Sequence, residues 1–95
     1  MKIYVQFFGK FREQFKTSYL WVTLPSGATI VDLIEELEKS TGVDIKKLIM
    51  NPEKEFMRND VSVLINGRSI AFLNGLRSKL NDMDKVIVSH LVAGG

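Results

Sequence analysis

Residues 29 to 42 are patterned as a single amphipathic helix, and this feature limits the possible folds more than any other. Apolar residues recur at i, i+3, i+4 and i+7, so they form one stripe along a helix: Ile30, Leu33, Ile34 and Leu37. Thr29 stands before the stripe as an N-cap, Asp32 follows it three positions later, and Gly42 is a C-cap candidate. A helix with one apolar stripe has to bury it against another layer of structure.

That second layer is predicted from alternation of apolar and polar residues, the pattern of strands with one buried face. We expect strands at residues 2–8, 19–24, 61–65, 68–73 and 85–91. Between them we expect a charged connection with at most one helical turn at 9–18, a short helix at 44–50 and a surface loop at 51–60. Asn66-Gly67 is a hairpin turn signal, and Asn81, Asp82 and Asp84 indicate a second turn.

This order predicts an α+β domain of two layers, in which the helix covers one face of a mixed sheet of four to five strands. A right-handed crossover carries the helix across the sheet, and the last strand then lies in the middle beside the first. The arrangement is a β-grasp fold. We expect the β-grasp domain at residues 1–91 and a flexible tail at 92–95.

Composition and charge exclude several functional classes. The 95 residues contain no cysteine, which excludes disulfides, thiolate metal sites and cysteine nucleophiles, and which favours the cytoplasm. No apolar run approaches the roughly 20 residues that cross a bilayer. The 13 basic and 11 acidic residues are intermixed, so neither membrane association nor direct nucleic-acid binding is expected.

The sequence also lacks a recognisable catalytic constellation. His90 is the single histidine and has no metal-ligating companion, so a place in the last strand explains it better than catalysis does. Asp82 and Asp84 fit a turn better than a catalytic pair. Asn66-Gly67-Arg68 does not have the strand-to-helix context of a phosphate loop. We therefore expect no metal, no bound cofactor and no active site: the protein is predicted not to be an enzyme.

The chain ends in Val92-Ala93-Gly94-Gly95, and this ending suggests that the terminal carboxylate is the reactive group. A carboxylate has to be activated before it reacts, which requires its entry into a narrow channel of another protein. Glycine fits such a channel because it has no Cβ, and it leaves the carbonyl carbon open to a nucleophile. Gly95 is the predicted reactive residue, with Val92, Ala93 and Gly94 providing passage.

Alternation also predicts an apolar surface on the sheet face that points away from the helix. An antiparallel sheet normally shows polar residues on its solvated face. Large apolar residues suggest a partner-binding patch instead; they are Tyr4, Phe8, Trp21, Leu64, Ile87 and Leu91. The alternative is that edge loops fold over some of them, with Trp21 in a small satellite cluster.

Five segments occur in an order typical of one family: IYVQFFGKFRE, LPSGATIVDLIEELE, INGRSIAFLNGL, LNDMDKV and the final VAGG. The chain resembles the MoaD and ThiS sulfur carriers, most closely archaeal MoaD-like proteins, which include small ubiquitin-like modifiers. The resemblance covers nearly all 95 residues. It also places a partner-contacting aromatic residue at Phe8.

The chain departs from the family in two places. Met83-Asp84 stands where the family commonly has Gly-Asp. Ser89, His90 and Leu91 stand where it commonly has an aromatic residue and two prolines. Both departures lie where family members meet their partners.

The resemblance implies a sulfur carrier such as the small subunit of molybdopterin synthase. A MoeB-like or ubiquitin-activating-like enzyme would use ATP in trans to adenylate Gly95, and a sulfur donor would convert the adenylate to a thiocarboxylate. A MoaE-like large subunit would then receive the sulfur for molybdenum cofactor biosynthesis. The same activation also serves a protein modifier attached to lysines of target proteins, or a carrier for tRNA thiolation. The third possibility is a non-covalent β-grasp binding module with a passive tail.

Overall fold

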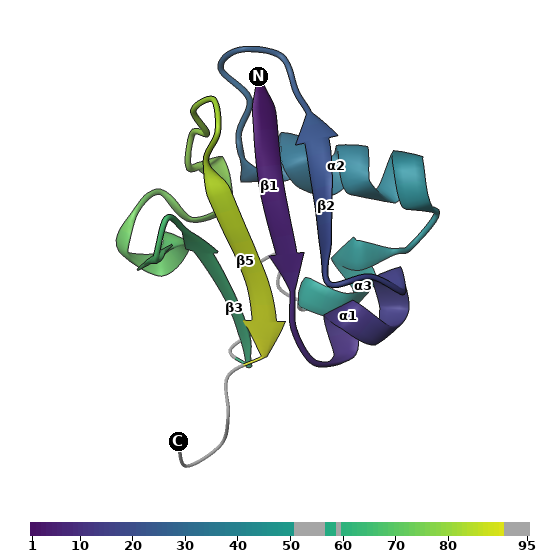
Figure 1. Cartoon of the computed structure of the whole chain (residues 1–95). Helices are drawn as coiled ribbons and strands as arrows, with labels where there is room; N and C mark the ends of the chain where they lie inside the picture. The colour runs from purple at the N-terminus through teal and green to yellow at the C-terminus, as the bar shows by residue number, and fades with distance from the viewer. Residues whose placement is uncertain (51–56, 59, 91–95) are drawn as a thin grey trace.

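The structure, a computed structural model, describes residues 1–50, 57, 58 and 60–90. Figure 1 shows one sheet with helices on one side and at one end. The strands are β1 (Lys2–Phe7), β2 (Tyr19–Thr23), β3 (Val61–Ile65), β4 (Arg68–Ser69) and β5 (Lys85–His90). The α-helices are α1 (Lys10–Phe15), α2 (Ile30–Thr41) and α3 (Ile45–Ile49), and two 3₁₀ turns are η1 (Ile70–Phe72) and η2 (Gly75–Arg77).

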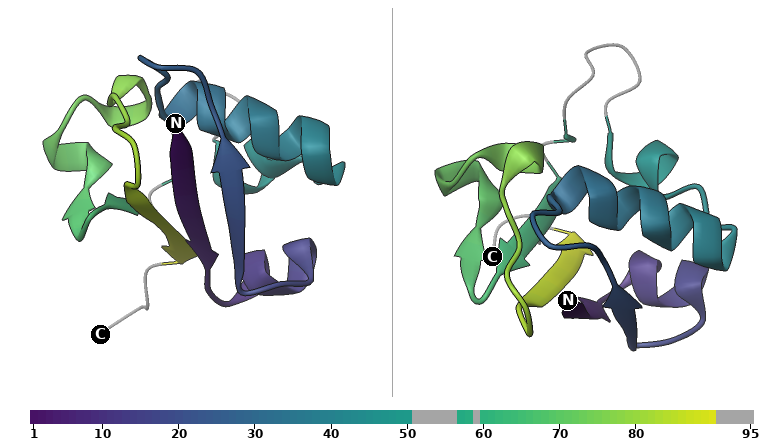
Figure 2. Two further views of the ribbon diagram at one scale, coloured as in Figure 1. Left: turned by 45° about the horizontal axis from the view of Figure 1, so that its top comes forward. Right: turned by 90° about the horizontal axis from the view of Figure 1, so that it is seen from above.

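The sheet has the mixed topology that the sequence predicts. Its strand order is β2-β1-β5-β3-β4. β1 runs parallel to β5, whereas the β1–β2, β3–β5 and β3–β4 pairs are antiparallel. The last strand therefore lies in the middle of the sheet beside the first, as expected. Helix α2 lies behind the β1–β2 side of the sheet (Figures 1 and 2).

Helix α2 buries the predicted stripe against the inner face of the sheet. All four stripe residues are buried, and they pack in one core with Ile3, Val5, Phe7, Val22, Val63, Val86 and Val88. The helix begins as expected, because the Thr29 amide donates a 2.8 Å hydrogen bond to Asp32 Oδ2. It ends at Gly42, whose φ of 76° is left-handed and whose N–H donates to the Glu38 carbonyl at 2.9 Å.

Two short helices close the end of the sheet where β1 and β5 finish. α1 buries Phe11 and Phe15, and the Phe15 ring stacks on Phe7 with centroids 4.2 Å apart. The connection at 9–18 is therefore a part of the core, which its charged residues did not suggest. α3 begins at the predicted cap, since the Asp44 carboxylate accepts a 3.2 Å hydrogen bond from the Lys47 amide.

The strand predicted at 68–73 is wrong beyond its second residue. β4 stops at Ser69, whose hydroxyl accepts a 3.2 Å hydrogen bond from the Ala71 amide and so begins the 3₁₀ turn η1. This turn directs Ile70 into the core, where it is 1% exposed. The local side-chain hydrogen bond and the burial of Ile70 together outweigh the strand pattern.

The turn before β5 contains a residue in an unfavourable conformation. Met83 has a φ of 69°, in the left-handed region, and its amide donates a 2.7 Å hydrogen bond to the Lys2 carbonyl. A side chain with a Cβ loses about 1 kcal/mol there relative to glycine. This cost accounts physically for the Gly-Asp that is common at this place in the resembling family.

We expect Met83→Gly to raise the thermal midpoint. The relief of backbone strain outweighs the greater entropy of the unfolded chain, for a net gain of about 0.5 kcal/mol or a few degrees. Met83→Ala is the matched control, because it removes the exposed side chain but keeps the Cβ. Equal midpoints for the two variants, measured by circular dichroism, would show that the turn is not strained.

Candidate functional site

Where the structure describes them, the residues that alternation predicted for the outer face of the sheet lie on it. Figure 1 looks onto this face, with α2 behind the sheet. Trp21 is 53% exposed and Phe8, which follows β1, is 46% exposed, while Leu64 and Ile87 are half-buried. The placement of these four side chains is as expected; their role in partner binding stays a prediction. Leu91, the last predicted member, lies outside the described residues.

Three aromatic side chains form a cluster on β1 and β2, here called the outer aromatic cluster: Tyr4, Tyr19 and Trp21. The Tyr4 ring stacks on Tyr19 with centroids 5.4 Å apart and meets Trp21 edge-on at 5.1 Å. The Lys85 ammonium lies 5.9 Å from the Tyr4 ring centroid. Trp21 therefore does belong to a small cluster, as the alternative expected, but the cluster is exposed and the Trp21 side chain is about half accessible. Tyr19 was not among the predicted site residues, although it lies two residues before Trp21 on β2 and therefore faces the same side of the sheet.

A smaller aliphatic area lies on the other half of the same face. Leu64 of β3 is the direct cross-strand neighbour of Ile87 of β5. Gln6 of β1 stands between Ile87 on one side and Tyr19 on the other. The outer face is thus two apolar areas separated by a polar residue, an arrangement suited to a partner with anchors at two positions.

His90 is the last residue of β5 and the last that the structure describes. Its ring stacks on Phe11 of α1, with centroids 4.6 Å apart and planes 21° from parallel. Its explanation as a strand residue is confirmed, and the stack ties the end of β5 to α1. The predicted tail residues Val92, Ala93, Gly94 and Gly95 lie outside the described residues.

A cleft of about 160 Å³, here called the tail-root cleft, opens beside His90. It is lined by Lys10, Phe11, Gln14, Lys47, Leu48, Arg58, Asp60 and His90. Arg58 binds Asp60 through both Nε and an Nη, at 3.0 Å each. These hydrogen bonds, together with the opposite charge, lower the pKa of Asp60 and raise the pKa of Arg58. The sequence did not suggest this cleft, because its residues are spread from position 10 to position 90.

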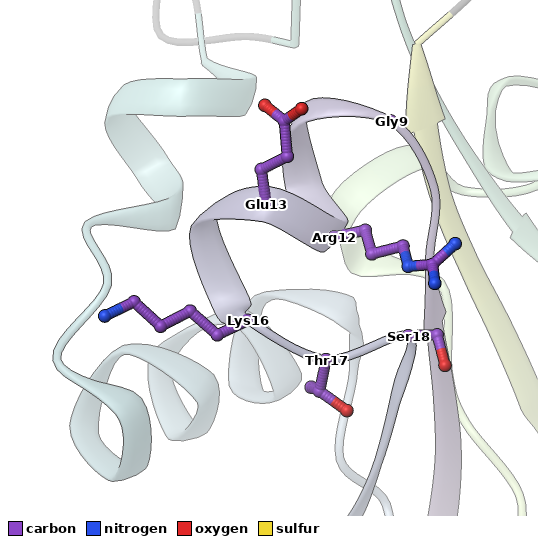
Figure 3. Close-up of a pocket in the computed structure, with 6 residues that line it drawn as sticks. All are labelled: Gly9, Arg12, Glu13, Lys16, Thr17 and Ser18. Atoms are coloured by element: carbon purple, nitrogen blue, oxygen red, sulfur yellow. The ribbon is translucent and has the colours of Figure 1, made fainter.

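A second and more open hollow of about 520 Å³ lies on another side of α1. Figure 3 shows that Arg12, Glu13 and Lys16 point in different directions around it. Catalysis requires groups that converge on one point, so this hollow has no catalytic arrangement. Within residues 1–50, 57, 58 and 60–90, no three His, Asp or Glu side chains are grouped to hold a metal ion. Nor does that part of the chain include a helix long and apolar enough to cross a membrane.

The topology and the open face define a small β-grasp protein of the ubiquitin-like class. The sequence profile of the ThiS family matches residues 5–95, and the chain belongs to that family. It is accordingly a carrier protein of the sulfur-carrier and small-archaeal-modifier type and not an enzyme.

Three similar proteins illustrate the relationship. Small archaeal modifier protein 3 of Haloferax volcanii is 33% identical over 95 residues, and the alignment covers both chains completely. The putative molybdopterin converting factor, subunit 1, of Pyrococcus furiosus is 30% identical, with a TM-score of 0.74 over 97% of this chain and 99% of that one. SAMP1 from Haloferax volcanii shares the fold, with a TM-score of 0.80 over the whole of both chains at 17% identity.

Proposed function

We propose that this protein acts through its C-terminus, as a ubiquitin-like protein modifier and sulfur carrier whose Gly95 carboxylate is activated by an ATP-dependent adenylating enzyme in the cytoplasm. The observation that carries the proposal is the match to the family and to a small archaeal modifier protein, since both alignments extend through Gly95. The fold supports it, because β5 leads the chain from the centre of the sheet towards these last residues.

The chemistry is an acyl activation followed by an acyl transfer. A Gly95 carboxylate oxygen attacks the α-phosphorus of ATP, and pyrophosphate leaves. A nucleophile then attacks the carbonyl carbon of the acyl adenylate, and AMP leaves. A lysine amine of a target protein, which loses a proton, gives an isopeptide bond. A hydrosulfide ion released by a sulfur donor, which also loses its proton, gives a thiocarboxylate. The carrier supplies only the carboxylate, and every catalytic group belongs to the partner.

The partner needs a surface to hold while the tail is in its channel. We assign that role to the outer face, with Phe8, Trp21, Leu64, Ile87 and the following Leu91 as the contact residues. Ordering four tail residues costs about 1–2 kcal/mol each in backbone entropy. Burial of the exposed part of Trp21 and Phe8 offsets part of that cost, because each large aromatic contributes on the order of 2 kcal/mol when fully buried.

Two measurements test the proposal. Incubation with the activating enzyme, ATP and a sulfur donor should raise the intact mass by the difference between sulfur and oxygen. In cell extract, tryptic peptides of target proteins should carry the C-terminal residues of this chain on lysine. A chain that gives neither the mass change nor any lysine adduct is not a carrier of this type.

A second candidate is the small subunit of a molybdopterin synthase. The similarity to the putative molybdopterin converting factor of Pyrococcus furiosus favours it specifically. The thiocarboxylate would then deliver sulfur to the molybdopterin precursor in a complex with a MoaE-like large subunit. Formation of molybdopterin by the thiocarboxylated protein and such a subunit distinguishes this role from protein modification; tRNA thiolation would instead require a thiolated tRNA product.

The docking role of the outer face predicts a kinetic effect of Trp21→Ala. We expect the KM for this protein in the adenylation reaction to rise about tenfold at unchanged kcat, because an exposed aromatic anchor contributes binding and no chemistry. Phe72→Ala is the matched control: Phe72 is 85% exposed but lies in η1, near the β4 edge. If both variants behave alike, the outer face is not the docking surface.

A further inference from the structure

The tail-root cleft gathers positive charge from three separate parts of the chain. Lys10 comes from α1, Lys47 from α3, and Arg58 from the segment before β3. Asp60 is the acidic residue in its lining, and it is already bound by Arg58 through two hydrogen bonds. Among the lining residues that the structure describes, the charge that remains to attract a ligand is therefore that of Lys10 and Lys47.

Lys46, the neighbour of Lys47, has a different environment, because its charge is paired within the chain. Lys46 turns to α2, where its Nζ lies 3.6 Å from Glu38 and 4.0 Å from Glu35. Adjacent lysines of the same helix thus have different environments: one faces carboxylates of its own chain, and the other lines a cleft with a second lysine. Two lysines that line the same cleft can both attract one anion inside it, which a single surface lysine cannot.

The size of the cleft restricts the ligand. Pockets that hold nucleotides or drug-sized molecules enclose about 300–1,000 Å³, whereas this cleft has about 160 Å³. That volume admits a single side chain. The stacked rings of Phe11 and His90 give it an apolar wall, which suits the methylene groups of an acidic side chain, while the lysines suit its carboxylate.

The position of the cleft restricts the source of that anion. The cleft adjoins His90, and the five residues that follow span at most about 17 Å when fully extended. α1, α3 and the end of β5 lie together at one end of the molecule (Figure 1). With the tail extended in the channel of the enzyme, Gly95 lies up to about 17 Å from His90. An anion in the cleft is therefore not one of the ATP phosphates that react with Gly95. It belongs to the surface around the mouth of the channel that admits the tail.

We propose that the tail-root cleft receives an aspartate or glutamate side chain of the activating enzyme, held by Lys10 and Lys47. This inference rests on the proposed function and adds a second contact to it, separate from the outer face. Opposite charges around the channel mouth increase the rate of encounter and orient the root of the tail. The contact acts on binding of the carrier and takes no part in the chemistry.

The test compares the KM of two charge-neutralised proteins in the adenylation reaction: the double variant Lys10→Gln/Lys47→Gln and the single variant Lys46→Gln. For Lys10→Gln/Lys47→Gln we expect the KM for the carrier to rise about fivefold to tenfold at low ionic strength, with kcat unchanged. The increase should shrink at about 1 M salt, where the screening length is about 3 Å. The matched control is Lys46→Gln, which removes a charge from the adjacent residue and should change the KM less than twofold.

The outcomes separate this inference from the function on which it rests. If the wild-type protein is adenylated and the double variant has the same KM and the same salt dependence, the cleft does not bind the enzyme and the proposed function stands. An equal effect of Lys46→Gln on the KM also overturns the inference, because the KM would then depend on the net charge of the carrier and not on the position of the lysine. If the wild-type protein is not adenylated at all, the proposed function itself fails.

Discussion

We expect Gly95→Val to abolish adenylation of the C-terminus without a change in the thermal midpoint. Valine adds a branched side chain next to the reacting carbonyl carbon, which hinders both entry into a narrow channel and attack by the nucleophile. The fold is expected to persist because we place the domain at residues 1–91 and the tail at 92–95. The measurements are ATP–pyrophosphate exchange, intact mass and circular dichroism.

Ala93→Gly is the matched control for this result. It changes the same tail two residues earlier but adds no side-chain atom, so it should be adenylated at about the wild-type rate. Deletion of Gly94 and Gly95 should remove all activity. Cellular function that survives this deletion would support the passive β-grasp binding module instead, and a wild-type adenylation rate for Gly95→Val would contradict the role of the glycine.

The second large effect concerns Asp84, a carboxylate that is 8% exposed. Its Oδ1 accepts a 2.8 Å hydrogen bond from the side-chain Nδ2 of Asn66, and its Oδ2 accepts one of 2.8 Å from the backbone N–H of Asn81. Asn66 Oδ1 in turn accepts from the Lys85 amide at 2.9 Å. Asp84 therefore joins the turn between β3 and β4 to the turn that precedes β5.

We expect Asp84→Ala to lower the free energy of unfolding by about 2–4 kcal/mol, because it leaves two donors without their acceptor in a part-buried site. In a domain of this size each kcal/mol lowers the thermal midpoint by roughly 4–8 °C. Asp84→Asn should cost less, since the amide oxygen can still accept one hydrogen bond. Denaturant unfolding, followed by the fluorescence of Trp21, measures both.

Asp82→Ala is the internal control, because Asp82 belongs to the same turn but is exposed. Its carboxylate accepts one hydrogen bond of 2.8 Å from the Lys2 amide, and we expect a loss of about 1 kcal/mol or less. Equal losses for the two aspartates would mean that the network around Asp84 does not stabilise the packing of β3 and β4 on β5.

The elements with strong local patterns were predictable from the sequence. The stripe of α2, its Thr29 and Gly42 caps, the alternation of β3 and the Asn66-Gly67 turn all appear where we expected them. Each depends on residues at most a few positions apart, so the sequence contains the whole of the relevant information. The short strand β4 was mispredicted, because the direction of Ile70 is decided by the core.

The sequence by itself determined the family, the β-grasp order of elements and the candidate reactive end, since all of these follow from local patterns and a short motif. Only the tertiary structure decided that Tyr19 joins the outer aromatic cluster, that Asp84 is buried, and that Lys10 and Lys47 share a cleft with His90. These features bring together residues that lie far apart along the chain. Which distant side chains meet is decided by the packing of the helices against the sheet, and no spacing along the chain encodes it directly.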